Sequence, residues 1–326
     1  MLPTPPTYRL FVGSDVAATT CAVAWMQLTT LPSRPVSIDQ TPAGFAELQR
    51  QLQAIEPDPQ AVPIVMEATG TYWMRLASSL SAAGLAVAVI NPAQAHDFAK
   101  ALLKRSKTDA IDAQTLSELG ARLQPECWTP LPQVYTELQQ RLVHRDGLVT
   151  ARTQFRNQLH ALVQQPVVIA SVQTRLETLV ATLDEQIAMV EQEIAEALQQ
   201  DKAWAAAAAR LATVSGLGTL TIAWILTTTV NFTLTATPEA AANYAGLAPQ
   251  LRQSGSSVRG RRRIGHRGNG RLRSALYMAS LSAAQHKMII REFYQRLRAA
   301  GKLKKVARCA AARKLLRIAW AVAVKG

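Results

Sequence analysis

The sequence contains few cysteines, and they follow no disulfide or metal-binding pattern. Cys21, Cys127 and Cys309 lie far apart in the chain, with no CxxC pair. This spacing argues against a disulfide framework and against a zinc site, and it fits the reducing environment of the cytoplasm. The first residues, MLPTPPTYRL, also lack the apolar core of a secretion signal. We therefore expect a cytoplasmic protein without disulfides.

Acidic residues are scarce in the last third of the chain. Residues 201–326 carry 22 basic and 3 acidic groups, whereas residues 1–200 carry 14 and 19. The formal net charge of +14 is therefore concentrated toward the C-terminal end. A basic region on a nearly neutral body is typical of proteins that bind the phosphates of nucleic acids, and an anionic membrane surface is the weaker alternative.

One uncharged stretch is long enough to cross a membrane. It runs from Leu211 to Val230 and contains six threonines, a serine and two glycines. A membrane span of this length needs predominantly apolar residues, so the composition fits a buried turn and helix better. We expect no contact with a membrane.

The segment Leu251–Arg273 has no acid but contains eight arginines, five glycines and three serines. Unpaired guanidinium groups are costly to desolvate, so the segment needs a polyanion beside it. Apolar, helix-forming sequence on both sides favours a loop held within a fold over a disordered tail. Its serines are candidate nucleophiles. Its candidate phosphate-binding residues are Arg252, Arg259, Arg261, Arg262, Arg263, Arg267 and Arg271.

The N-terminal third alternates between strand and helix patterns. Turn residues separate three short strand patterns, and Thr41 followed by Pro42 is typical of a helix start. The expected strands are 8–17, 20–28, 35–40, 62–66 and 85–90, and the expected helices are 43–55, 72–84, 93–104 and 108–123. Three strands, a helix, a strand, a helix, a strand and further helices follow the order of the ribonuclease H-like α/β fold.

Four acids occupy informative places in this pattern. Asp15 ends the first strand, Glu67 ends the fourth, and Asp109 and Asp112 share one face at a helix start. The carboxyl ends of neighbouring strands are where open α/β sheets bind ligands. Each acid alone has an ordinary explanation, such as a turn or the helix dipole. Together, four converging carboxylates would repel one another without a cation, and hard oxygen ligands suit Mg²⁺.

The middle of the chain predicts two long helices after a proline-rich linker at 125–132. The first covers 133–165 and carries Arg141, Arg145, Arg152 and Arg156 on one face, which is either a solvated face or a phosphate-contacting surface. In the second, apolar residues recur at intervals of three and four from Val172 to Leu198 and predict a coiled-coil seam. The partner of this seam is the preceding helix or another subunit.

The C-terminal region is predicted to be helical. An alanine-rich helix at 203–210 precedes Val214–Gly218, which is similar to a helix-hairpin-helix turn that meets a phosphate. A short helix at 238–247 leads into the arginine-rich segment. Two basic amphipathic helices, 272–290 and 302–324, follow and are candidates for RNA and DNA contacts.

These features resemble the DEDD transposases of bacterial insertion sequences, family one-hundred-and-ten and its relatives, also known as bridge-RNA-guided recombinases. The resemblance covers essentially the whole chain and rests on GSDVA, MEATGTYW, VINPAQAHDFAKALLKRSKTDAIDAQTLSEL and YAGLAPQLRQSGSSVRGRRRIGHRGNGRLRSALYMA. It implies an N-terminal RuvC-like domain (1–128), an α-helical coiled-coil region (129–202) and an α-helical transposase domain (203–326).

The resemblance also implies roles for particular residues. Asp15, Glu67, Asp109 and Asp112 match the family's Mg²⁺-binding tetrad. Ser254 matches the nucleophile that forms a covalent phosphoserine with DNA, and Ser256 and Ser257 are weaker candidates. The implied partners are donor and target DNA, an element-encoded guide (bridge) RNA and further copies of the chain in a dimer or tetramer, in the bacterial cytoplasm at the nucleoid.

Two other functions remain open at this point. A metal-dependent junction-resolving nuclease would use the four acids with an activated water and form no covalent intermediate. A non-catalytic RNA- or DNA-binding protein would keep the fold without the chemistry, and the intact set of four acids speaks against it.

Overall fold

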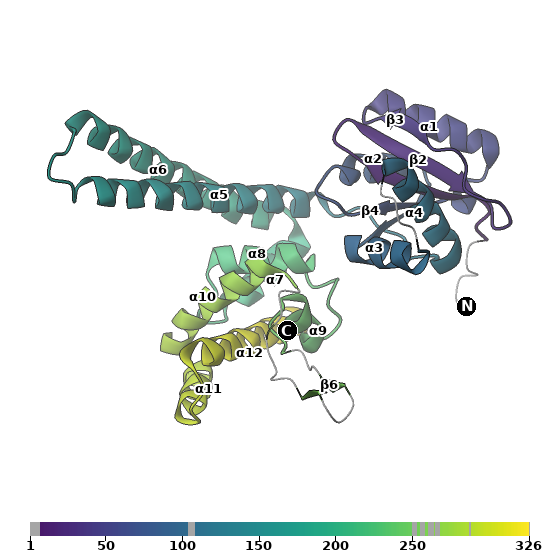
Figure 1. Cartoon of the computed structure of the whole chain (residues 1–326). Helices are drawn as coiled ribbons and strands as arrows, with labels where there is room; N and C mark the ends of the chain where they lie inside the picture. Colours follow the sequence, from purple (N-terminus) through teal and green to yellow (C-terminus); the bar gives the residue numbers. More distant parts are fainter. Residues whose placement is uncertain are drawn as a thin grey trace. The chain divides into compact units, whose positions relative to one another are not determined.

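The computed structural model describes residues 7–103, 108–249, 253–254, 258–259, 264, 268–286 and 288–325. The chain divides into two units, residues 1–130 and residues 131–326 (Figure 1). The first is an α/β unit, and the second is built mainly from helices. The division falls beside the expected boundary at residue 128.

The first unit is built on a five-stranded sheet in the order β3-β2-β1-β4-β5. Its strands are β1 (Phe11–Val16), β2 (Thr20–Met26), β3 (Val36–Asp39), β4 (Pro63–Glu67) and β5 (Ala86–Ile90). The first three strands pair antiparallel, whereas β4 is parallel to β1 and β5 is parallel to β4. This topology confirms the predicted ribonuclease H-like order.

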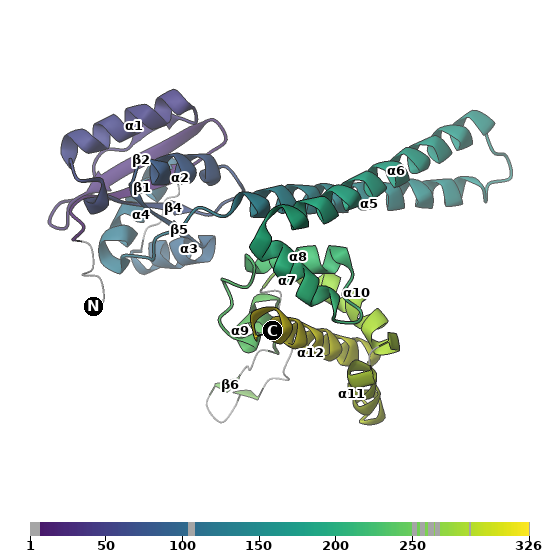
Figure 2. The ribbon, with the colours of Figure 1, turned by 180° about the vertical axis from the view of Figure 1, so that it is seen from behind.

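Helices cover both faces of this sheet (Figures 1 and 2). They are α1 (Pro42–Ile55), α2 (Trp73–Ala82), α3 (Pro92–Ala101) and α4 (Asp109–Leu123), with a short 3₁₀ turn at Pro59–Ala61. The cores on the two faces are separate. Leu48 of α1 and Leu76 of α2 pack on one face with Val12 and Met66. Leu116 of α4 packs on the other.

Threonine N-caps begin two of these helices, α1 and α4. The Thr41 side chain accepts a hydrogen bond from the Gly44 amide, with Pro42 in the first turn, as the sequence predicts. The Thr108 hydroxyl accepts a hydrogen bond from the Ile111 amide at 3.3 Å and so fixes the start of α4.

Strand β1 and helix α4 touch through their main chains. A Cβ atom on Gly13 would lie 2.1 Å from the Ala113 carbonyl oxygen and 2.3 Å from the Ser117 amide nitrogen. Farther along α4, a Cβ on Gly120 would meet the Phe11 and Val65 side chains. The helix therefore runs antiparallel to β1, and its N-terminal turn lies at the end of β1 that carries Asp15.

The second unit begins with a long helical hairpin (Figure 1). Its helices are α5 (Gln133–Leu162) and α6 (Ala170–Gln200), followed by α7 (Lys202–Ala212), α8 (Thr219–Thr229), α9 (Pro238–Tyr244), α10 (Gly270–His286), α11 (Met288–Ala299) and α12 (Lys304–Lys325). One hydrophobic core joins the base of the hairpin, at Leu138 and Ile194, to helices as distant as α12. The expected coiled-coil region 129–202 and domain 203–326 therefore pack as one unit.

The predicted apolar seam of α6 is buried only near this base. Ile187, Val190, Ile194 and Leu198 are buried, whereas Val172 is exposed. Its partner in the structure is the preceding helix, which is one of the two alternatives left open by the sequence.

The uncharged stretch 211–230 forms the end of α7, a turn and α8, as predicted. Within the described ranges, no helix is long and apolar enough to cross a membrane. In the turn, a Cβ on Gly216 would lie 2.6 Å from the Ala283 side chain, so this glycine serves the packing of the turn onto α10.

The C-terminal helices differ from the expected pair 272–290 and 302–324, because α11 (Met288–Ala299) carries helical structure beyond residue 290. Arg291 of α11 donates hydrogen bonds to the Ala284 and Gln285 carbonyls in the last turn of α10. A side chain of α11 thus contacts the C-terminal carbonyls of α10.

We predict that Gly13→Ala destabilises the protein by about 3 kcal/mol, because overpacking a rigid contact forces the main chain apart. Urea denaturation of the full chain measures the free energy of unfolding. Gly147→Ala is the control: nothing lies within 4 Å of a Cβ at this position in α5, and alanine gains about 1 kcal/mol over glycine in a helix. An unfolding free energy of Gly13→Ala equal to that of the wild type would contradict the close contact.

Candidate active site

Asp15 and Glu67 stand at the ends of neighbouring parallel strands. The register pairs Ser14 of β1 with Met66 of β4, and the two acids follow directly. Side chains alternate along a strand, so Asp15 lies on the face of Gly13 and Glu67 on the face of Val65. Both are the face that α4 covers.

The first turn of α4 brings the other two acids to the same edge. Asp109 and Asp112 lie in this turn, and α4 packs over β1 with its N-terminus toward the end that carries Asp15. Asp109 is exposed, and Asp112, like Asp15 and Glu67, is half-buried. We call these four residues the acid edge. Their assignment to a metal-binding tetrad stays a prediction.

Two neighbouring side chains, Thr69 and Cys21, interact with the carboxylates of the acid edge. The Thr69 hydroxyl donates a hydrogen bond to the Glu67 carboxylate. Burial, together with the negative charge of Asp15, raises the pKa of the Cys21 thiol to about 11. Cys21 therefore stays protonated at neutral pH and is a structural residue rather than a nucleophile.

Within the part of the chain that the structure describes, no three His, Cys, Asp or Glu side chains gather as ligands of a metal ion. The donor set of the acid edge is nevertheless entirely carboxylate, which is the chemistry that Mg²⁺ prefers. The assignment of the four acids to a magnesium site stays a prediction.

Gln40 connects the segments that follow β1 and β4 through two hydrogen bonds, a role that its sequence context does not reveal. Its buried side-chain amide donates to the Ala17 carbonyl at 3.0 Å and to the Tyr72 carbonyl at 3.1 Å. Ala17 follows the end of β1, and Tyr72 lies in the loop after β4. A polar residue before a helix start is ordinary in sequence, so only the fold reveals that it bridges two segments.

The segment with the candidate nucleophile is described only in part. Ser254 lies in β6 (Gln253–Ser254), which pairs antiparallel with β7 (Val258–Arg259), and Ser254 stands opposite Val258. For Ser254 and Arg259 the description covers the main chain. The other predicted residues, Arg252, Arg261, Arg262, Arg263, Arg267, Ser256 and Ser257, lie outside the described residues. Arg271, in the first turn of α10, lies over the Trp224 ring at 5.6 Å.

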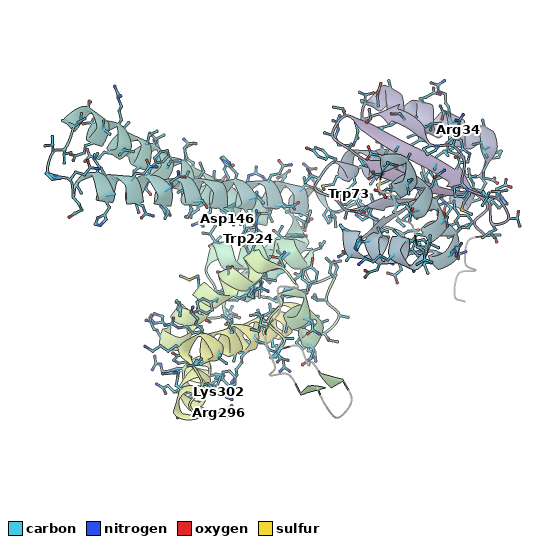
Figure 3. All side chains as sticks on the ribbon, in the orientation of Figure 1. Arg34, Trp73, Asp146, Trp224, Arg296 and Lys302 are labelled. Atoms are coloured by element: carbon cyan, nitrogen blue, oxygen red, sulfur yellow. The ribbon has the colours of Figure 1, made fainter. Side chains whose placement is uncertain are left out.

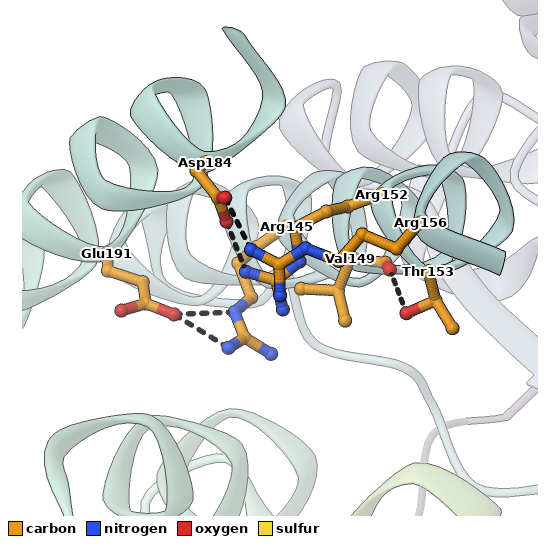
Figure 4. Close-up of polar contacts among 7 residues, drawn as sticks. All are labelled: Arg145, Val149, Arg152, Thr153, Arg156, Asp184 and Glu191. Carbon is orange, nitrogen blue, oxygen red and sulfur yellow. Dashed lines mark hydrogen bonds and ion pairs between the residues drawn. The ribbon is translucent and has the colours of Figure 1, made fainter. Parts of the chain in front are cut away.

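The four arginines of α5 form ion pairs with acids of α6, and Figure 4 shows those of Arg145, Arg152 and Arg156. Arg141 donates to Glu193 at 3.1 Å and Arg145 to Glu191 at 2.6 Å. Asp184 accepts from Arg152 at 2.7 Å and from Arg156 at 2.5 Å. The acids occur in reverse order along α6, which is the sequence signal for an antiparallel pair. Nucleic-acid binding by these arginines stays a prediction, and each would have to exchange a carboxylate for a phosphate.

Comparisons with known proteins match most of the chain. A family model described as a DEDD-type transposase matches residues 12–167, and one described as Transposase IS116/IS110/IS902 family matches residues 208–295. The pilin gene-inverting protein of Moraxella bovis is 29% identical over 319 residues, which are 96% of this chain and 95% of that protein.

Two further comparisons concern a second transposase and a solved structure. The transposase for insertion sequence element IS1328 of Yersinia enterocolitica is 28% identical over 306 residues, covering 82% of this chain and 85% of that protein. Among solved structures, T. thermophilus RuvC in complex with a Holliday junction substrate aligns with 12% identity and a TM-score of 0.23, over 38% of this chain and 85% of that chain.

We predict that the hairpin loses stability in acid. The hydrogen bond from Arg152, reinforced by Arg156, lowers the pKa of Asp184. Because the folded pKa lies below the unfolded one, the ion pairs stabilise the folded state at pH values above the unfolded pKa of about 3.9. This contribution is lost as the pH falls below that value and through the lower folded pKa. Thermal unfolding followed by circular dichroism should show a smaller acid-induced loss in Asp184→Asn than in the wild type.

Glu185→Gln is the matched control for this measurement, since Glu185 is the neighbouring acid on the exposed side of α6. It should keep the acid sensitivity of the wild type. Equal acid-induced losses in Asp184→Asn and the wild type would show that the two arginines do not stabilise the hairpin through Asp184.

Proposed function

Because the chain belongs to the IS116/IS110/IS902 transposase family and is thus a DNA-recombining transposase, we propose that it cuts and rejoins DNA strands through Ser254 and the acid edge. The observation that carries this proposal is the position of four acids at one edge of the sheet: Asp15 and Glu67 end adjacent parallel strands, and Asp109 and Asp112 lie in the first turn of α4, which packs antiparallel to β1.

The proposed chemistry conserves the energy of the phosphodiester bond. The Ser254 oxygen attacks a DNA phosphorus, the bond from this oxygen to phosphorus forms, and the bond to a deoxyribose oxygen breaks. The serine proton is lost, and the released deoxyribose oxygen takes up a proton. When a deoxyribose hydroxyl of another strand attacks the phosphoserine, the strands are joined and the serine is released. No ATP is needed, which suits recombination.

The residues of the chain have distinct parts in this scheme. Asp15, Glu67, Asp109 and Asp112 would hold a divalent cation, which supplies charge stabilisation at the reacting phosphate when it is bound. Arg259 and the neighbouring arginines would hold the phosphate through paired hydrogen bonds. A serine hydroxyl is a weak nucleophile and needs such activation. The scheme requires the acid edge and Ser254 to act on the same phosphate, within one subunit or between two.

We also propose that an RNA encoded with the element guides the reaction. Base pairing would then read the donor and target sequences, while the protein binds backbone and shape. Exchange of strands between two duplexes needs several nucleophiles, so the working form would be a dimer or tetramer. The basic C-terminal helices supply charge for these contacts.

A junction-resolving nuclease is the alternative that the acid edge alone would also support. It would cut with water and release both ends. The similarity to a gene-inverting protein over 96% of the chain favours rejoining, because inversion requires that cut ends are joined again.

We predict that wild-type protein forms a covalent adduct with a suicide DNA substrate whose leaving strand diffuses away, and that Ser254→Ala forms none. The adduct is measured as a protein of reduced mobility in a denaturing gel, with the attachment site identified by mass spectrometry. Ser257→Ala, in the same segment, is the control and should keep the adduct. Cleavage by Ser254→Ala, with no adduct on the wild type, would favour the nuclease.

We predict that Asp15→Asn lowers strand cleavage by roughly 10²-fold or more, because loss of one charge-stabilising group at a reacting centre costs this much. The measurement is the cleavage rate as a function of Mg²⁺ concentration. Asp39→Asn, which changes an exposed acid at the end of β3, should retain the wild-type rate and Mg²⁺ dependence. Full activity of Asp15→Asn would remove the acid edge from the mechanism.

A further inference from the structure

An open groove lies in the second unit between α5, α8 and the start of α10. It encloses a volume of 780 Å³, within the range of about 300–1,000 Å³ that is typical of small-molecule sites. Asp146 of α5 and Trp224 of α8 both line it and are labelled in Figure 3. The roles proposed above leave this groove unassigned.

The walls of the groove combine apolar surface with a cation. Leu220 and Trp224 from α8 and Met278 from α10 supply the apolar part, and Met278 is 63% exposed. Arg271 lies over the Trp224 ring, and in the described part of the chain it forms no ion pair with an acid. Arg145, by contrast, is already paired with Glu191 at 2.6 Å.

An apolar wall beside a guanidinium group limits which ligands fit the groove. A purely apolar ligand would strip water from Arg271 without replacing it, at a large cost. A bare phosphate would leave the apolar wall around Leu220 and Met278 unfilled. A flat ring that carries a phosphate satisfies both parts, since the ring packs on apolar and aromatic surface and the phosphate pairs with the guanidinium. In a paired duplex the faces of the rings are stacked and inaccessible.

We propose that the groove binds one unpaired nucleotide of a nucleic-acid strand, with its base against Met278 and Leu220 and its phosphate on Arg271. The inference rests on the proposed function, because the groove residues Arg271 and Met278 belong to α10, which follows the segment that carries Ser254 in the sequence. Extrusion of a base from a duplex costs a few kcal/mol, and a base-sized pocket repays it. The unpaired nucleotide belongs to DNA or to RNA.

Binding of short oligonucleotides to the full chain tests this proposal. The probes are a single-stranded DNA, the same sequence as RNA, a fully paired duplex, and a duplex with one unpaired nucleotide, and the measurement is the dissociation constant by fluorescence anisotropy. Arg271→Gln and Met278→Ala should each weaken binding of probes with an unpaired nucleotide by about tenfold. The fully paired duplex should be little affected. The DNA and RNA arms show which strand is bound.

Arg296→Gln is the matched control. Arg296 also lies over an aromatic ring, that of Phe293 at 5.5 Å, but it is outside the groove. The Arg296→Gln substitution removes one positive charge and one cation–π contact, as Arg271→Gln does. It should leave the preference for unpaired probes unchanged. The proposal would be overturned if Arg271→Gln and Arg296→Gln lost the same affinity, or if paired and unpaired probes lost the same affinity. Arg271 would then contribute only its positive charge to nonspecific binding.

The outcome is separable from that of the proposed function. If the wild type forms a Ser254 adduct while Arg271→Gln and Met278→Ala bind every probe normally, only the groove is wrong. If the two variants lose unpaired probes selectively while no adduct forms on the wild type, the groove stands and the serine chemistry fails.

Discussion

The contact between the main chains of β1 and α4 at Gly13 is the constraint on which the acid edge depends. The Ala113 carbonyl and the Ser117 amide occupy the space of a side chain at this position. Helix and strand are therefore as close as two main chains allow, and the first turn of α4 is carried to the end of β1. Carboxylates from segments nearly a hundred residues apart in sequence reach one edge because a single glycine permits this approach.

The positive charges of the second unit are balanced by acids in the hairpin but not in the region after residue 200. In the hairpin, arginines of α5 and acids of α6 neutralise one another and fix the antiparallel pairing. Exposed pairs of this kind contribute little each, but their order along the helices specifies the register. In the region after residue 200 acids are scarce, and Glu239 pairs with Arg317. The large excess of cations there is available for the proposed contacts with nucleic-acid phosphates.

The sequence predicted those features that depend on local pattern. The strand order and the helix starts at Thr41 and Thr108 follow from hydrophobic periodicity and capping, and the places of Asp15 and Glu67 follow from the strand ends. Features that depend on contacts distant in sequence were missed. Gln40 bridges Ala17 and Tyr72, and Arg291 of α11 donates a hydrogen bond to the Ala284 carbonyl of α10. The pairing of the α5 arginines depends on which acids of α6 lie opposite them in the hairpin, and this register is visible only in the fold.

The proposed mechanism requires the acid edge to bind a divalent cation. Replacement of Mg²⁺ by Fe²⁺, followed by local generation of hydroxyl radicals, cuts the main chain near a bound metal and maps the site on the full chain. We expect cuts near Asp15, near Glu67 and in the first turn of α4, all suppressed by an excess of Mg²⁺. Cuts confined to other segments, or cuts at these places that Mg²⁺ does not suppress, would contradict a shared cation at this edge.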